Sequence, residues 1–301
     1  MARVLVSIPA PEDCLAALAG HELLEGPPGS DPEAQGLLCA PVTPVDRGAI
    51  AAMPELLAIA VAGAGTDAID KAAAGARGIE ILTAGEALVE TTADLAFALI
   101  LAAARTTGEA EAALRSGSWQ GWGFWETSGR DVSGATLGLV GYGAIGRAVA
   151  RRAAGFSMTV LHHTRTPTGE PGWREELDDL LAASDIVSLH VPLSDSTRGL
   201  IDARRIGLIG PSGVLVNTAR GAVTDELALA AALREGRLLA AGLDVYASEP
   251  RVAPELLAAP RAILLPHVGS ATTRTRRAMF TLAAERLAAF LAAPIGSAGD
   301  G

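Results

Sequence analysis

Short apolar runs alternate with half-polar, helix-like stretches from the start of the chain. This alternation predicts strands that pair in a parallel sheet, with helices between them. The expected strands are Arg3–Ser7, Gly36–Ala40, Leu56–Val61 and Ile79–Leu82. The expected helices are Glu12–Leu18, a loop plus helix over Val42–Met53 with Thr43 as N-cap, and a helix that runs from a Thr66 or Asp67 N-cap through Ala74.

The same alternation restarts at Thr136 and predicts a second parallel sheet. Its strands are expected at Thr136–Val140, Met158–His163, Ile186–Val191, Gly213–Asn217, Leu239–Asp244 and Ala262–Leu265. Its helices are expected at Arg147–Ala154, Glu175–Ala183, Ala203–Ile209, Asp225–Arg234 and Ala253–Ala259, with Thr224 as the N-cap of the fourth.

Two long helical runs connect the two sets of strands. Thr91–Leu114 is rich in Ala and Leu and is expected to lead out of the first domain, and Thr272–Leu291 is expected to return to it. A chain of 301 residues is long enough for two domains. The predicted division therefore joins residues 1–95 with 271–301 in one domain and assigns residues 96–270 to the other.

Composition narrows the class of protein. The net charge of −10 argues against general nucleic-acid binding. Cys14 and Cys39 are the only cysteines, so neither a disulfide framework nor a metal cluster is expected. We predict no transmembrane helix and no signal peptide, and these features together favour a cytoplasmic enzyme.

A glycine fingerprint lies between the first strand and the first helix of the second set. Gly141, Gly143 and Gly146 spell G-x-G-x-x-G, with Ala144 and Ile145 between the last two glycines. In this context the first glycine permits a tight turn, the second lets the backbone approach a pyrophosphate, and the third lets helix and strand pack closely. The free N–H groups of the helix N-terminus then face the phosphates. The sequence therefore predicts a dinucleotide site.

The end of the next strand indicates which dinucleotide binds. Proteins that bind NAD carry Asp or Glu there, which accepts a hydrogen bond from the ribose 2′-hydroxyl. This chain has no acid at that point and instead carries Arg165 between Thr164 and Thr166. An arginine flanked by hydroxyl groups suits a 2′-phosphate. We therefore expect NADP as the cofactor, with NAD as the alternative.

Three later strands of the second set end in residues suited to catalysis. The three segments are Val216–Gly221 with Arg220, Gly242–Pro250 with Glu249, and Pro266–Thr272 with His267. The carboxyl ends of parallel strands border the ligand crevice of an open α/β sheet, so we expect the three side chains to converge. Arg220 can pair with a substrate carboxylate, while Glu249 should favour the protonated form of His267, a general acid. This set suits the reduction of a 2-keto acid by a nicotinamide cofactor.

With these motifs, the chain resembles the D-isomer-specific 2-hydroxyacid dehydrogenases over nearly its whole length, most strongly over residues 92–272. The matching motifs are Thr92–Leu95, Gly141–Gly146, His190–Leu193, Asn217–Gly221, Gly242–Val245, Glu249-Pro250 and His267–Thr272. Within the family, the Trp119–Gly123 stretch and the Arg165 strand end are most similar to glyoxylate/hydroxypyruvate reductases. The resemblance implies two doubly wound parallel-sheet α/β domains, a flavodoxin-like substrate domain and a Rossmann dinucleotide-binding domain. It also implies a homodimer.

The resemblance assigns roles to individual residues. Arg220 resembles the residue that grips the substrate carboxylate and carbonyl, His267 the general acid/base, and Glu249 its carboxylate partner. Ala64 and Gly65 match the turn whose backbone amides bind the substrate carboxylate. The implied cofactor contacts, beyond Gly141, Gly143, Ala144, Ile145, Gly146 and Thr164–Thr166, are Thr92, His190, Val191, Pro192, Thr197, Thr218, Ala219, Arg220, Asp244, His267 and Gly269.

An aromatic stretch and two functional alternatives stay open. Trp119, Trp122, Phe124 and Trp125 lie among glycines. They form either a wall of the substrate pocket, with Trp122 and Trp125 as contacts, or a packed structural loop. Besides a glyoxylate or hydroxypyruvate reductase, the sequence allows a dinucleotide-sensing binding protein of the same fold. It also allows an NAD-dependent D-2-hydroxyacid dehydrogenase with another substrate.

Overall fold

The computed structural model describes residues 1–124 and 128–293. Its internal contacts divide the chain into two units, Met1–Val89 with Ser270–Gly301, and Glu90–Gly269. Each unit holds one sheet in which every strand pair is parallel. The expected fold class, two doubly wound parallel-sheet α/β domains, is confirmed.

The first unit is built on a five-stranded sheet of order β2-β1-β3-β4-β5. Its strands are β1 (Arg3–Val6), β2 (Glu22–Glu25), β3 (Gly36–Cys39), β4 (Ala58–Val61) and β5 (Glu80–Thr83). This is the flavodoxin-like strand order. Strands β3 and β4 are buried along their whole length, because helices cover both faces of a parallel sheet.

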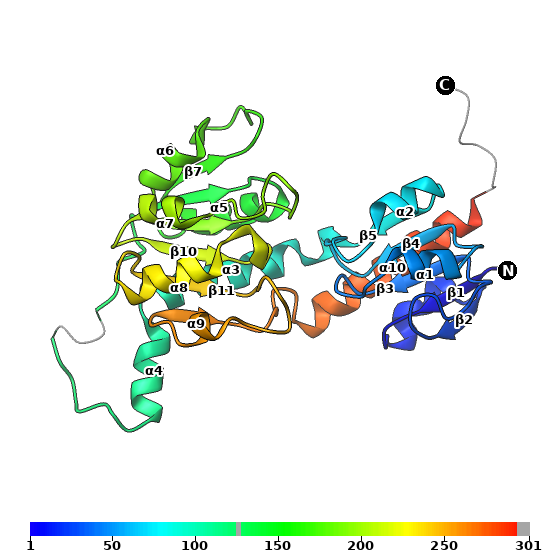
Figure 1. Cartoon of the computed structure of the whole chain (residues 1–301), viewed down its shortest axis with the longest axis horizontal. Helices are drawn as coiled ribbons and strands as arrows, with labels where there is room; N and C mark the ends of the chain where they lie inside the picture. The colour runs from blue at the N-terminus through cyan, green and yellow to red at the C-terminus, as the bar shows by residue number, and fades with distance from the viewer. Residues whose placement is uncertain (125–127, 294–301) are drawn as a thin grey trace. The chain divides into compact units, whose positions relative to one another are not determined.

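Helices enclose that sheet from both sides (Figure 1). They are η1 (Glu12–Leu18), α1 (Arg47–Ala52), α2 (Lys71–Ala76), η2 (Gly85–Leu88) and α10 (Thr273–Ala292). One core cluster joins Ile50 and Met53 of α1 to Leu37 and Ile59 of the sheet. A second cluster includes Leu287 of α10, so the last helix of the chain completes the first unit.

The second unit is built on a seven-stranded sheet of order β12-β11-β10-β9-β6-β7-β8. Its strands are β6 (Thr136–Val140), β7 (Thr159–His163), β8 (Trp173–Arg174), β9 (Ile186–Leu189), β10 (Val214–Asn217), β11 (Ala240–Leu243) and β12 (Ala262–Leu264). Counted from β6, this is the 3-2-1-4-5-6 order of the Rossmann fold with one further strand. The order reverses between β6 and β9, and ligands of such sheets bind at that switch point.

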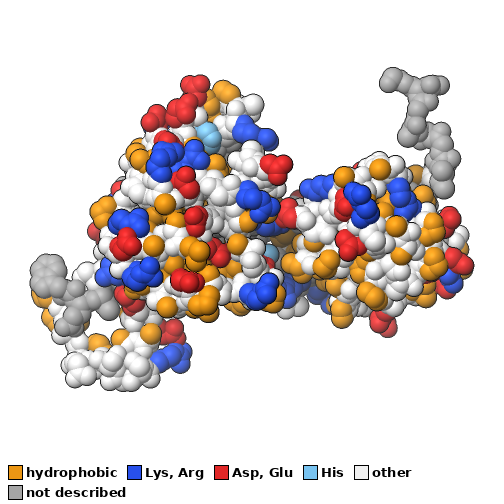
Figure 2. All heavy atoms as spheres, in the orientation of Figure 1, with side chains coloured by type: hydrophobic (Ala, Val, Ile, Leu, Met, Phe, Trp, Pro, Cys, Tyr) orange, Lys and Arg blue, Asp and Glu red, His pale blue; other side chains and the backbone are white. Residues whose placement is uncertain are grey.

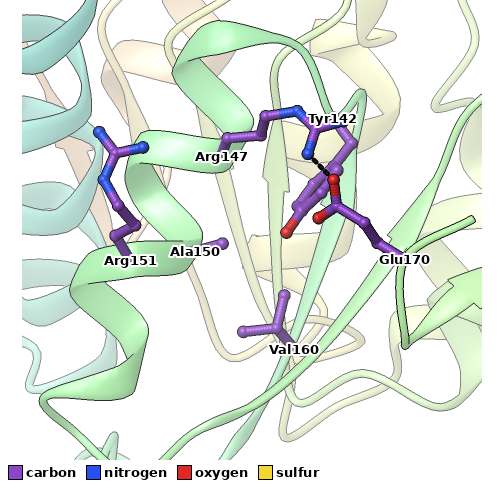
Figure 3. A pocket seen from close by; sticks show the side chains of 6 residues that line it. All are labelled: Tyr142, Arg147, Ala150, Arg151, Val160 and Glu170. Carbon is purple, nitrogen blue, oxygen red and sulfur yellow. Dashed lines mark hydrogen bonds and ion pairs between the residues drawn. The ribbon is translucent and has the colours of Figure 1, made fainter. Parts of the chain in front are cut away.

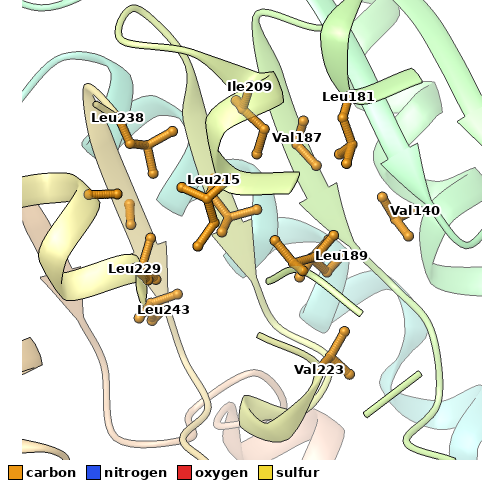
Figure 4. Packing of buried hydrophobic residues seen from close by; sticks show 14 of the residues in the cluster. Val140, Leu181, Val187, Leu189, Ile209, Leu215, Val223, Leu229, Leu238 and Leu243 are labelled. Atoms are coloured by element: carbon orange, nitrogen blue, oxygen red, sulfur yellow. The ribbon is translucent and has the colours of Figure 1, made fainter. Parts of the chain in front are cut away.

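The helices of the second unit pack on both faces of this sheet. They are α3 (Val89–Ala104), α4 (Thr107–Arg115), α5 (Ala144–Ala154), α6 (Leu177–Ala182), α7 (Ala203–Ile209), η3 (Gly221–Val223), α8 (Glu226–Arg234) and α9 (Pro254–Leu257). Leu181, Ile209 and Leu229, from three of these helices, pack with Leu215 and Leu243 of the strands (Figure 4). On the other face, Leu99 of α3 lies against Gly242 of β11, where an added Cβ would approach to 3.0 Å.

The predicted helical run Thr91–Leu114 is two helices. α3 ends at Ala104, and Thr106 has a left-handed φ of 49° before α4 begins. The Arg130 N–H donates to the Ala104 carbonyl at 2.6 Å, so a later segment of the chain occupies the end of α3. The stretch Gly85–Ala104 is long and apolar enough to span a membrane by length and composition, but half of it is buried within the protein, as in a core helix.

The three helices whose N-caps the sequence analysis placed at threonine or at Asp67 begin at other aspartates instead. Asp46, Asp70 and Asp225 each accept a hydrogen bond from the backbone N–H three residues on, at 2.8, 2.8 and 3.0 Å. A carboxylate is a strong cap and also favours the positive end of the helix dipole. Thr43 instead accepts the Ala40 N–H at 3.2 Å and stabilises the turn before α1.

Two edge strands were not predicted. β2 pairs with β1, and β8 pairs with His162 and His163 of β7. Both are short and half-exposed, so their sequences lack the apolar run of a central strand. On the visible face, acidic and basic side chains are interspersed, without a large region of one sign (Figure 2).

Candidate active site

The fingerprint turn leaves room for a ligand where an ordinary turn would hold side chains. Gly141 has a φ of 95°, and an added Cβ would lie 2.6 Å from the His190 carbonyl oxygen. A Cβ on Gly146 would lie 2.4 Å from the Gly141 oxygen. Gly143, the N-cap of α5, faces open space. The turn is therefore tight against β9 and open at the helix N-terminus, which fits a dinucleotide pyrophosphate.

The segment that follows β7 carries the residues predicted to select the nucleotide. Arg165 and Thr166 are exposed and Thr164 is half-exposed. The Thr164 hydroxyl donates to the Thr166 carbonyl at 2.7 Å, which bends the segment around Arg165. No carboxylate stands at this strand end in the sequence, so nothing there would repel a 2′-phosphate.

His190 closes the other side of the fingerprint. The backbone N–H of His190 donates to the Val140 carbonyl at 2.7 Å. The Nε2 atom of its ring lies 2.9 Å from the Ser188 hydroxyl oxygen. Burial lowers the pKa of His190 to about 4. The imidazole is therefore neutral at pH 7 and adds no charge beside the glycine turn.

This neutral His190 makes stability depend on pH. The unfolded chain binds a proton near pH 6.5 and the folded chain does so near pH 4, so the contribution is complete above pH 6.5 and falls as pH drops toward 4. His190→Gln should remove about 2–3 kcal/mol of that acid-induced loss. Urea unfolding between pH 4.5 and 7.5 measures it, and parallel curves for wild type and variant would contradict the assignment.

The Arg220 turn is shaped by a buried asparagine. The Asn217 side chain accepts the Ala219 N–H and donates to the Arg220 carbonyl, both at 2.9 Å. Gly221 follows, and an added Cβ there would lie 1.9 Å from the Tyr246 carbonyl carbon. The segments after β10 and β11 therefore touch backbone to backbone.

His267 and Glu249 are in direct contact. His267 Nδ1 lies 2.7 Å from Glu249 Oε2, and Glu249 Oε1 accepts the Tyr246 N–H at 2.9 Å. The two side chains are 38% and 29% exposed, so the pair is supported from within and still open to a ligand. His267 has a left-handed φ of 54°, an uncommon conformation for a residue with a side chain.

Asp244 holds that conformation. It is buried, and its two carboxylate oxygens accept the Val268 and Gly269 N–H groups at 2.7 and 2.8 Å. Burial raises its pKa, and the two backbone donors act in the opposite direction. The resemblance implied Asp244 as a cofactor contact, and in the structure its carboxylate fixes the loop that carries His267.

Glu226 is a member of this network that the sequence analysis missed. Its Oε1 accepts the Ala247 N–H at 2.6 Å, and burial together with the nearby Glu249 charge raises its pKa. Glu226 lies in the first turn of α8, where acidic residues are common because they interact favourably with the helix dipole. That position alone therefore does not indicate a role in the site. Only the folded chain shows that it supports the Glu249 loop.

Three threonines of the second unit were also predicted to contact the cofactor. In the second unit, Thr218 Oγ1 is buried and has no partner within the described residues, so it offers a donor and an acceptor to a ligand. Thr197 donates to the Pro192 carbonyl at 2.6 Å, beside Val191. Thr92 is buried on α3, with its hydroxyl 3.6 Å from where a Cβ on Gly269 would stand.

Four further residues were predicted to contact the substrate. Ala64 and Gly65 belong to the first unit, in the segment after β4. Trp122 is 80% exposed, and Trp125 lies outside the described residues. Among residues 1–124 and 128–293, no group of His, Cys, Asp and Glu is arranged to hold a metal ion.

This fold and its glycine turn define a two-domain, dinucleotide-binding α/β protein. The family profile described as D-isomer specific 2-hydroxyacid dehydrogenase, NAD binding domain, matches residues 97–269. The chain therefore belongs to the D-isomer specific 2-hydroxyacid dehydrogenase family, and the resemblance inferred from its motifs is confirmed.

Similar proteins agree with this assignment. A glyoxylate reductase of Thermococcus litoralis is 41% identical over 86% of this chain and 81% of its own. A glyoxylate reductase of Korarchaeum cryptofilum is 40% identical over 96% of this chain and 92% of its own. The solved structure of an NADPH-dependent glyoxylate/hydroxypyruvate reductase from Sinorhizobium meliloti, in complex with NADP and malonate, is 34% identical with a TM-score of 0.88. That match covers 97% of this chain and 94% of the other.

Proposed function

We propose that this protein reduces a small 2-keto acid, glyoxylate or hydroxypyruvate, to the 2-hydroxy acid with NADPH, and that it forms the D-isomer where the product is chiral. The observation that carries the proposal is the 2.7 Å contact between His267 and Glu249 beside the Arg220 turn. All three residues follow the ends of neighbouring parallel strands, β10, β11 and β12. The names of the glyoxylate reductases similar to this chain support the substrate class.

The chain's own residues supply proton transfer and orientation. Glu249 contacts His267 through Nδ1, which leaves Nε2 to hold the proton that goes to the substrate carbonyl oxygen. The Glu249 carboxylate also fixes the orientation of the imidazole ring. Arg220 presents a fork of donors that pairs with a carboxylate and polarises the adjacent carbonyl. NADPH, when bound, supplies the hydride to the carbonyl carbon.

The cradle for the cofactor rests on the glycine turn and on the segment after β7. The N–H groups at the start of α5 suit the pyrophosphate, and Thr218 Oγ1 offers a buried polar atom to the rest of the dinucleotide. Arg165, exposed and flanked by two threonines, favours NADPH over NADH. The NADP bound to the Sinorhizobium meliloti reductase is consistent with this choice.

Arg165→Ala should raise the KM for NADPH about 10- to 100-fold and leave the KM for NADH nearly unchanged. Only NADPH carries a 2′-phosphate, so only NADPH loses a contact in this variant. A charge-assisted contact contributes about 1.5–3 kcal/mol. Initial rates with both cofactors at one fixed keto acid measure the effect. Arg237→Ala is the control, because Arg237 pairs with Glu235, two residues away, at 2.7 Å. Equal changes in both KM values would reject Arg165 as the discriminator.

We also propose that the exposed aromatic segment is covered by a second copy of the chain. Leu114, Trp119, Trp122 and Phe124 are each at least 59% exposed, and large apolar side chains grouped in this way mark an interaction surface. Analytical ultracentrifugation of the purified protein tests it, and a monomer at micromolar concentration would contradict it. The alternative, in which Trp122 forms a wall of the substrate pocket, stays a prediction from the sequence.

The proposal is tested by following NADPH and NADH absorbance at 340 nm with glyoxylate, hydroxypyruvate and bulkier keto acids. We expect turnover with the two small acids and the higher kcat/KM with NADPH. Tight NADPH binding without turnover of any keto acid would instead favour a dinucleotide-sensing protein.

A further inference from the structure

A pocket of about 410 Å³ lies on the α5 side of β7, next to the glycine turn (Figure 3). Its lining includes Tyr142, the second residue of the fingerprint, together with Arg147 of α5 and Glu170 of the segment after β7. Tyr142 has no part in the roles described above. The lining residues join the turn that receives the pyrophosphate to the segment that carries Arg165.

The contacts on the fingerprint side are made by Tyr142. The guanidinium carbon of Arg147 lies 4.7 Å from the centre of the Tyr142 ring, a cation–π contact. Tyr142 also stacks on the ring of His162 of β7, with the ring centres 3.9 Å apart and an angle of 17° between the planes. Arg147 also forms an ion pair with Glu170 (Figure 3).

The contacts on the loop side complete a ring. His162 Nε2 lies 2.7 Å from the Thr168 hydroxyl, and the Glu170 N–H donates to the same hydroxyl at 3.2 Å. His162 is fully buried, and desolvation together with the positive charges of Arg147 and Arg174 lowers its pKa. A neutral ring can stack on Tyr142 without repelling Arg147. Thus Arg147, Tyr142, His162, Thr168 and Glu170 form a closed set of contacts, which we call the loop clamp.

The loop clamp restrains the segment with the nucleotide-selecting residues at both ends. Residues 164–166 leave β7 directly, and the chain is caught again at Thr168 and Glu170. Arg165 lies between these two attachment points and is itself exposed. Without the second attachment, the segment would sample more conformations, and each would move the guanidinium away from a 2′-phosphate.

We propose that Arg147 and Glu170 are positioning residues that hold the Thr164–Thr166 segment for a 2′-phosphate and so set the preference for NADPH from outside the binding site. This inference rests on the proposed function, which assigns NADPH as the cofactor. It predicts that loss of the ion pair weakens recognition of the 2′-phosphate specifically and leaves the chemical step intact.

The same helix offers a matched control. Arg151, one turn further along α5, lines the same pocket and pairs with Glu90 of α3. Its side chain is 61% exposed, against 43% for Arg147, and the Arg151–Glu90 pair does not involve the segment after β7. A general effect of removing an arginine from α5 should therefore appear in Arg151→Met as well as in Arg147→Met.

The test is isothermal titration of the full chain with adenosine 2′,5′-bisphosphate and with 5′-AMP, which differ by the 2′-phosphate. In Arg147→Met and Glu170→Gln, the ratio of the two affinities should fall about three- to tenfold, as expected for loss of a half-exposed ion pair and the order it imposes. Arg147→Lys should retain most of the ratio, and Arg151→Met should match wild type. In steady-state assays, KM for NADPH should rise in the clamp variants while kcat at saturating NADPH stays unchanged.

The outcomes separate the two claims. If wild type binds both nucleotides equally, the NADPH assignment is wrong, and this inference falls with it. If wild type prefers the bisphosphate but Arg147→Met and Glu170→Gln keep the wild-type ratio, as Arg151→Met does, the loop clamp does not set the preference. Melting temperatures of all variants show whether a changed ratio reflects unfolding.

Discussion

His267→Ala should reduce kcat for keto-acid reduction about 10²- to 10⁴-fold, because the variant lacks the side chain that we propose as the general acid for the carbonyl oxygen. Nucleotide affinity should persist, since the glycine turn and Arg165 are unchanged. The measurement is single-turnover reduction of hydroxypyruvate at saturating NADPH, together with titration of NADPH into the variant.

A control histidine separates this loss from a general effect. His21 accepts the Ala2 N–H at 3.2 Å and has no part in the candidate site, so His21→Ala should keep wild-type turnover. If His267→Ala retained more than a tenth of the wild-type kcat, the proton would have to come from another group.

The second large effect is expected from Gly221→Ala. A methyl group there would stand 1.9 Å from the Tyr246 carbonyl carbon, so the Arg220 and Glu249 segments must separate. A displacement of about 1 Å at a reacting centre can cost on the order of 100-fold in rate, and we expect a loss of kcat/KM of at least that size. Initial rates with glyoxylate and hydroxypyruvate measure it.

Gly207→Ala is the matched control for this substitution. Gly207 lies in α7 of the same unit, and an added Cβ would meet nothing within 4 Å. Alanine there should raise stability by about 0.5–1 kcal/mol and leave the rate unchanged. Wild-type kinetics in Gly221→Ala would show that the two segments can separate without harm to the site.

The central strands and the glycine turn could be predicted because their signals are local. Buried parallel strands are continuous apolar runs, and β6 and α7 begin and end at the predicted residues. The rule that strand ends border the crevice predicted that Arg220, Glu249 and His267 converge, and the structure brings Glu249 and His267 to 2.7 Å, while the catalytic roles of all three stay a prediction.

What could not be predicted depends on contacts between distant parts of the chain. α3 ends because the segment at Arg130 takes the Ala104 carbonyl, and no local pattern in 91–114 contains that information. The edge strands β2 and β8 form because a neighbouring strand pairs with them. Likewise, nothing in the sequence around Glu226 or Glu170 sets it apart from a solvent-exposed acid. The role of Glu226 depends on its contact with Ala247, and that of Glu170 on its ion pair with Arg147.

The residue that caps each helix also could not be predicted from the sequence pattern. Thr43, Asp46, Thr224 and Asp225 are all good N-cap residues, and neighbouring candidates compete for the same helix start. Backbone geometry decides between them, because the cap must be extended and its oxygen must reach the N–H three residues on.

Reduction of a small 2-keto acid to the D-isomer, with hydride from NADPH and a proton from the protein, is the function that we propose. Its most direct test is chiral analysis of the product after the purified protein is incubated with hydroxypyruvate and NADPH. We expect D-glycerate in an amount equal to the NADPH oxidised. L-glycerate, or no glycerate at all while NADPH is bound, would contradict it.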